Sequence, residues 1–153
     1  MRRLFAYGVA TLGAAAALSA TLGTAAQASS SPVVIHEIYY NSPGSDRGSN
    51  SSLNAEWVEL HNPSARAVSL THWTLRDKAH HVYTFGNYSL KAHGYVKVHT
   101  GKGSNTPANR YWGHSWYIWN NNGDAATLEN SGGTVQSRCS YSDPREKHAS
   151  KVC

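Results

Sequence analysis

The stretch that most constrains the fold of this chain is Glu56–Asn62, in which apolar and polar residues alternate. Val58 and Leu60 fall on one side of an extended chain, whereas Glu59 falls on the other. Pro63 then ends the run, because proline has no backbone N–H to offer a sheet. The stretch therefore predicts a central strand of an antiparallel sheet with one face in the core.

The N-terminus has the organisation of a secretory signal peptide. Arg2 and Arg3 form a short positive region, residues 4–22 are uncharged and mostly small or apolar, and Ala26-Gln27-Ala28 is a small-x-small cleavage motif. A membrane anchor and a twin-arginine signal are the alternative readings. The weakly apolar run and the cleavage motif favour a signal peptide over residues 1–28, cleavage between Ala28 and Ser29, and a short leader over residues 29–32.

Cleavage would leave about 125 residues, a length typical of a single domain. It would also remove two arginines and no acidic residue, so the formal net charge would fall from +5 to +3. No later apolar stretch is long enough to span a bilayer. We therefore expect a secreted, extracellular protein with no membrane span after processing, a domain over residues 33–141 and a polar tail over residues 142–153.

The two cysteines, Cys139 and Cys153, both lie near the C-terminus. In an oxidising, exported setting an even pair is typical of a disulfide rather than of free thiols. The bond would close a ring of about 15 residues and contribute ~3 kcal/mol of stability in the chain-entropy model. We expect it to hold the tail against the last strand, outside the sandwich.

Short stretches rich in β-branched and aromatic residues recur between turn signals every eight to twelve residues. No helix is expected after the signal peptide. The pattern predicts an all-β protein, a β-sandwich of eight or nine short strands. The main strand stretches are residues 33–40, 56–62, 68–76, 82–85, 95–99, 126–128 and 135–141.

Several of these stretches together resemble the lamin tail domain family, in order and spacing, from Val33 to Tyr141. The resemblance is to the small secreted bacterial members, because no coiled-coil heptads precede the domain. It implies an immunoglobulin-like β-sandwich that acts as a binding or accessory module and brings no catalytic residues. The matching motifs are Ile35-His36-Glu37-Ile38, Glu56–Asn62, Leu70 with Trp73-Thr74-Leu75, Tyr83-Thr84-Phe85, Leu90–Gly94 with Val96 and Val98, and Trp119–Leu128 with Gly133.

Residues 110–122 are unusually rich in aromatic side chains. The resemblance places Trp112 and Trp119 at motif positions, where they would close one end of the core. Trp116 and Tyr117 fall between the motifs, and large aromatic rings are enriched in recognition surfaces. We expect a ligand surface there, with polar contacts from the neighbouring residues His114, Ser115 and Asn120.

No pattern in the chain predicts catalysis, a metal site or a cofactor. The nine histidines show no metalloprotease spacing, and no serine stands in a nucleophile elbow. Glu56 and Glu59 point to opposite faces of a strand and cannot act as a pair. The lysines and arginines are spread along the chain rather than clustered.

The sequence therefore favours a secreted, non-catalytic binding module. We expect its partner to be a protein or a carbohydrate of the cell envelope, with which it would associate, or of the secreted fraction. A nucleic-acid-binding module is the first alternative. A small secreted hydrolase or enzyme accessory domain is the second.

Overall fold

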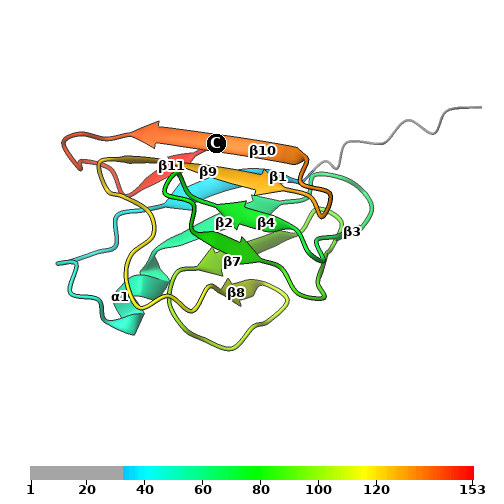
Figure 1. The fold of residues 1–153 in the computed structure, drawn as a ribbon, viewed down its shortest axis with the longest axis horizontal. Coiled ribbons are helices and arrows are strands. Elements are labelled where there is room, and N and C mark those ends of the chain that lie inside the picture. Colours follow the sequence, from blue (N-terminus) through cyan, green and yellow to red (C-terminus); the bar gives the residue numbers. More distant parts are fainter. Residues whose placement is uncertain (1–32) are drawn as a thin grey trace, which may run out of the picture.

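The computed structural model describes residues 33–153, which form two facing β-sheets (Figure 1). The five-stranded sheet has the order β11-β1-β2-β7-β8, the four-stranded sheet has the order β10-β9-β4-β5, and β3 pairs with β6. This is the predicted all-β, immunoglobulin-like sandwich. The predicted cleavage site and leader lie outside the described residues. The strands are β1 (Val34–Tyr39), β2 (Trp57–His61), β3 (Val68–Ser69), β4 (Thr74–Arg76), β5 (Val82–Thr84), β6 (Ser89–Leu90), β7 (Tyr95–His99), β8 (Asn109–Tyr111), β9 (Gly123–Glu129), β10 (Val135–Ser142) and β11 (Ser150–Val152).

β2 lies at the centre of the five-stranded sheet, antiparallel to both β1 and β7. Val58 and Leu60 are fully buried, and their cross-strand partners on β7, Val98 and Val96, are fully buried as well. Glu59 is half-buried on the opposite face. The predicted central strand and its face assignment are therefore confirmed.

β1 departs from the strict alternation that the sequence predicts for it. The sequence places Val34 on the same face as Ile38 and Tyr40, but Val34 is exposed and Ile35 is buried with Ile38. The register of β1 against β2 shifts between Ile35 and Glu37, which marks a β-bulge. Because a bulge adds one residue to one strand, the residues before it change face.

A short helix, α1 (Asn50–Ala55), precedes β2 in a region for which the sequence predicts only a loop. Ser49 caps its N-terminus, where the Ser49 side chain accepts a hydrogen bond from the backbone N–H of Ser52. Leu53 is the buried residue of the helix and anchors it to the domain. Six residues form no stable helix in isolation, so these contacts maintain it. The expectation of no helix is wrong.

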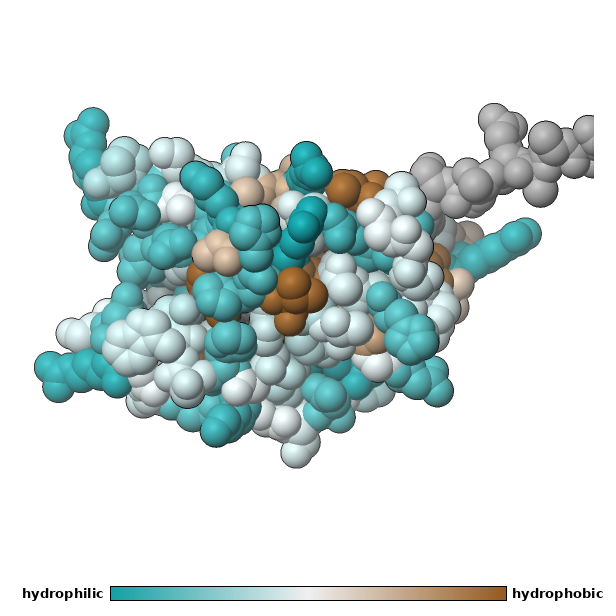
Figure 2. Space-filling model, viewed as in Figure 1, coloured by the Kyte–Doolittle hydropathy of each residue, from teal (hydrophilic) through white to brown (hydrophobic). Residues whose placement is uncertain are grey.

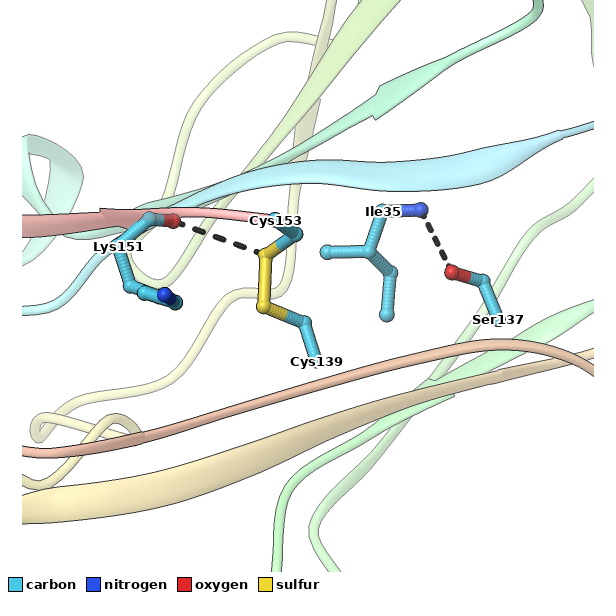
Figure 3. The surroundings of a disulfide bond; sticks show 5 residues. All are labelled: Ile35, Ser137, Cys139, Lys151 and Cys153. Atoms are coloured by element: carbon cyan, nitrogen blue, oxygen red, sulfur yellow. Dashed lines mark hydrogen bonds between the residues drawn. A yellow bond between two sulfur atoms is a disulfide. The ribbon is translucent and has the colours of Figure 1, made fainter.

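The C-terminal tail adds a strand to the sandwich instead of lying outside it. β11 pairs antiparallel with β1, with Ile38 opposite Lys151. Cys139 on β10 and Cys153, just after β11, form the disulfide. Because β10 and β11 belong to different sheets, the bond joins the two sheets (Figure 3).

A hydrogen bond crosses the same gap, from the backbone N–H of Ile35 to the hydroxyl of Ser137 at 3.0 Å (Figure 3). Residues 33–153 contain eleven strands and not eight or nine, because β8 and the tail strand β11 lie outside the strand stretches expected from the sequence.

The core between the sheets is one continuous cluster of buried side chains, which includes Trp119, Phe85 and Leu128. On the face drawn in Figure 2, hydrophobic residues form only small, separate patches between polar ones. Within residues 33–153, no helix has the length and apolar character needed to cross a membrane.

Candidate functional site

Residues 112–120, in the segment between β8 and β9, are called here the aromatic loop. Its first part continues alongside β7 through backbone hydrogen bonds. The N–H of Trp112 donates to the carbonyl of His99 at 2.8 Å, and the N–H of His114 donates to the carbonyl of Thr100 at 2.9 Å. The loop therefore leaves the sheet in a fixed direction.

Two buried carboxylates hold the second part of the loop. Oε1 of Glu56 accepts hydrogen bonds from the N–H of Ile118 at 2.8 Å and from the hydroxyl of Thr100 at 2.6 Å. Oδ2 of Asp124 accepts from the N–H of Asn120 at 3.2 Å and from its side-chain amide at 2.8 Å. These hydrogen bonds anchor the backbone of the loop at Ile118 and Asn120.

Trp112 and Trp119 belong to the core end of the loop. Trp119 is 1% exposed, and Trp112 is half-buried against the same cluster. Their ring centroids lie 6.2 Å apart in an edge-to-face arrangement. The prediction that these two rings close one end of the core is confirmed.

Trp116 and Tyr117 lie on the outer side of the loop. Trp116 is 59% exposed, so the fold leaves more than half of this large side chain open to solvent. One edge of its indole lies over Gly48, where φ is +70°, a backbone conformation that favours glycine. Tyr117 is half-buried, and its hydroxyl lies 2.6 Å from the hydroxyl of Ser52 on α1.

These rings border a shallow groove of about 340 Å³, called here the Trp116 groove. It is lined by Asp46, residues 116–122 and Glu146. Of the five residues that the sequence suggests for ligand contact, the groove contains Trp116, Tyr117 and Asn120. The acidic residues Asp46 and Glu146 come from two other loops, and sequence reasoning missed them because they are distant in the chain.

His114 and Ser115, the other two suggested residues, do not line this groove. The ring of His114 packs edge-to-face against Trp112 and His81, with centroids at 5.8 and 5.4 Å. Burial, and then the nearby His81, lowers the pKa of His114. Nδ1 of His81 in turn lies 2.7 Å from a carboxylate oxygen of Asp77. His114 therefore belongs to a separate histidine cluster.

Glu56 is the residue of the site with the most unusual environment. It is fully buried, and its Oε2 atom has no hydrogen-bond partner among the described residues. Burial raises the pKa of its carboxyl group to about 7, although hydrogen bonds from Thr100, Ile118 and Trp119 oppose the shift. The nearby Asp46 raises it further. Glu56 therefore changes protonation near neutral pH.

The alternation that predicts β2 also contains the signal for this burial. Glu56 shares its phase with Val58 and Leu60, so period-two reasoning places it on the core side. A buried carboxylate needs hydrogen-bond donors, and these come from Thr100 and Ile118. The sequence does not reveal which residues supply them.

A larger hollow of about 550 Å³ lies on the other side of Asn122 and is lined in part by Lys78, Asp124 and Tyr141. It contains no exposed tryptophan, and Tyr141 uses its hydroxyl to donate to the carbonyl of Asn120. We regard the smaller Trp116 groove as the better candidate because it presents an exposed aromatic ring on an anchored loop. Within residues 33–153, no group of three or more His, Cys, Asp or Glu side chains is arranged to hold a metal ion.

Comparison with known proteins agrees with this architecture. Residues 26–143 match the family model of the lamin tail domain, so the match ends before β11. A search of curated proteins found no match. The lamin tail domain is an immunoglobulin-like, non-enzymatic fold that suggests an interaction module. This chain belongs to the lamin tail domain family.

Proposed function

We propose that this protein is an exported binding module that holds a ligand of the cell envelope or the secreted fraction in the Trp116 groove. The observation that carries the proposal is the 59% exposure of Trp116 on a loop whose backbone is anchored by hydrogen bonds to the buried side chains of Glu56 and Asp124. An exposed ring on an ordered loop provides contact area at a small entropic cost.

The export part of the proposal rests on the sequence of the first 28 residues, with their uncharged run and the Ala26-Gln27-Ala28 motif. The disulfide between Cys139 and Cys153 is compatible with an oxidising compartment. The absence of a helix able to cross a membrane within residues 33–153 is compatible with a module free of the bilayer.

Charge disfavours the nucleic-acid alternative at this site. Nucleic-acid binding depends on lysine and arginine side chains that contact phosphates. Within the described part of the chain, the lining of the groove includes two acidic residues, Asp46 and Glu146, and no lysine or arginine. A phosphate backbone would be repelled there.

The experiment compares the mature protein with Trp116→Ala for co-sedimentation with isolated cell-envelope material. Trp116→Ala should weaken binding about tenfold, the effect of losing an aromatic anchor, with little change in melting temperature. Tyr95→Ala is the matched control, because Tyr95 is also an exposed aromatic residue (45%) but lies on β7 outside the groove. Equal binding by wild type and Trp116→Ala would contradict the proposal.

Tyr117 requires a different variant because its hydroxyl contacts α1. Tyr117→Ala would remove the contact with Ser52 and confuse a binding effect with a folding effect. Tyr117→Phe removes the hydroxyl alone. It should lower the stability slightly and leave binding intact, since the ring that lines the groove is retained.

A further inference from the structure

The charge of the Trp116 groove is opposite to the charge of the whole chain. The formal net charge is +5, yet Asp46 and Glu146 both line the groove. A third acid, Asp124, lies behind the groove and accepts a hydrogen bond from the side-chain amide of Asn120. Three of the nine acidic residues, Asp46, Asp124 and Glu146, thus lie in or against one small groove. Its potential favours a cation.

Basic residues stand next to these acids in the sequence, but they do not line the groove. Arg47 follows Asp46, and Arg145 and Lys147 flank Glu146. All the side chains that line it within residues 33–153 are acidic, amide, aromatic or apolar. The local excess of negative charge is therefore not neutralised by a basic side chain in the lining.

The polar atoms of the groove are mainly acceptors. The side-chain amide of Asn121 donates to Oδ2 of Asp46 at 3.1 Å, and the side-chain amide of Asn120 donates to Asp124. These contacts direct the amide nitrogens of Asn120 and Asn121 toward the protein's own carboxylates. Carboxylate and amide oxygens accept hydrogen bonds, so the complementary ligand is rich in donors.

We infer that the Trp116 groove binds an amino sugar, whose ammonium group is held by the carboxylates of Asp46 and Glu146 and whose ring lies against Trp116. The inference rests on the proposed function and names its ligand class. An ammonium group satisfies the acceptors, ring hydroxyls can donate further hydrogen bonds, and an indole face attracts a cation. A volume of about 340 Å³ is at the small end for ligand sites and suits one or two sugar units.

The experiment is a calorimetric titration of the mature protein with two oligosaccharides that differ in the nitrogen substituent of each sugar, a free amine in one and an acetamido group in the other. One is a glucosamine tetramer and the other is its fully N-acetylated counterpart, at a mildly acidic pH where the free amine is protonated. The glucosamine tetramer should bind about tenfold more tightly. Added salt should weaken its binding, because exposed charges are screened.

Charge-neutral variants identify the carboxylates. Asp46→Asn and Glu146→Gln should each weaken binding of the glucosamine tetramer about two- to fivefold, as for exposed ion pairs, and should leave the N-acetylated tetramer unaffected. Glu37→Gln is the matched control, because it removes the same charge from β1, away from the groove. Melting temperatures check that all three variants are folded.

The outcomes separate this inference from the proposed function. If both tetramers bind with equal affinity and Trp116→Ala loses this binding, the ammonium assignment is overturned and the groove remains a sugar site. If tetralysine binds as tightly as the glucosamine tetramer, the sugar assignment is overturned in favour of a basic peptide. If neither tetramer binds while envelope material still binds through Trp116, the inference fails and the proposed function stands.

Discussion

Glu56 Oε1 accepts a hydrogen bond of 2.8 Å from the backbone N–H of Ile118, a residue 62 positions further along the chain. The bond ties the aromatic loop to the residue that caps the end of α1 and precedes β2. It places an ionisable group beneath the Trp116 groove. The fold and the proposed site therefore share a group that titrates near neutral pH.

The raised pKa of Glu56, about 7, predicts a stability that falls with increasing pH. Between the pKa of an unfolded glutamic acid and 7, the folded state binds more protons than the unfolded state. The contribution of Glu56 to the free energy of unfolding is thus fully present below about pH 4.5, declines between pH 4.5 and 7 and is lost above pH 7, on the order of 3 kcal/mol at most.

Urea unfolding at about pH 5 and about pH 8 measures this difference. Glu56→Gln should reduce it, because glutamine does not titrate and can still accept from the N–H of Ile118. Glu59→Gln is the control and should leave the pH dependence unchanged, since Glu59 lies on the outer face of β2. The same pH dependence in wild type and Glu56→Gln would show that another group is responsible.

The two faces of β2 should respond differently to substitution. Leu60→Ala removes a fully buried side chain and should lower the free energy of unfolding by ~2–5 kcal/mol. Glu59→Gln should be nearly neutral, because Glu59 is only half-buried and its contact with Nε2 of His36 is long, at 3.9 Å. Denaturant titration of both variants provides the test. If Glu59→Gln lowers the free energy of unfolding more than Leu60→Ala does, the outer face of β2 takes part in an interaction other than the contact with His36.

The disulfide should stabilise the pairing of β11 with β1. Cys153→Ser should lower the free energy of unfolding by ~2–4 kcal/mol, because it opens a short ring and frees the tail. Amide exchange should then accelerate in β1 more than in β2, which retains both of its neighbouring strands. Val152→Ala is the matched control, since this residue of β11 is 62% exposed and should be neutral. Two alkylatable thiols in the unreduced native protein would contradict the bond itself.

Export with cleavage after Ala28 remains a sequence prediction. The N-terminal sequence of the protein recovered from the medium or the envelope should begin at Ser29. A product that keeps Arg2 and Arg3 and stays in the membrane fraction would contradict it.

The predictable part of the fold is the part that local patterns encode. The alternation of Val58 with Leu60 and of Val96 with Val98 identifies two paired strands and their buried faces. The turn at residues 130–133 separates β9 from β10, as its glycines indicate, and Gly133 has a positive φ of 78°. These features depend on side-chain period and turn chemistry, which a single sequence contains.

The features that the sequence did not reveal depend on contacts between distant segments. The bulge in β1 is set by its register with β2, and α1 persists because Leu53 packs onto the domain. β11 is too short and too polar to be recognised as a strand, and it forms because β1 and Cys139 hold it. No local pattern carries this information.

The candidate site was partly predictable for the same reason. Trp116 and Tyr117 could be identified because their aromatic character is unexplained by any strand pattern or family motif. The acidic side of the groove could not, because Asp46 and Glu146 belong to loops far apart in the sequence. The family match adds the framework but ends at residue 143, before Glu146.

β11 also has a consequence for how copies of this protein meet one another. A sheet edge with unpaired backbone groups can add a strand from another chain and so begin aggregation. β11 occupies the edge that β1 would otherwise present, with Lys151 and Val152 exposed along it. The new edge is only three residues long, carries a charge and is fastened by a covalent bond. The tail thus replaces a six-residue edge with one that is poorly suited to recruiting a second copy.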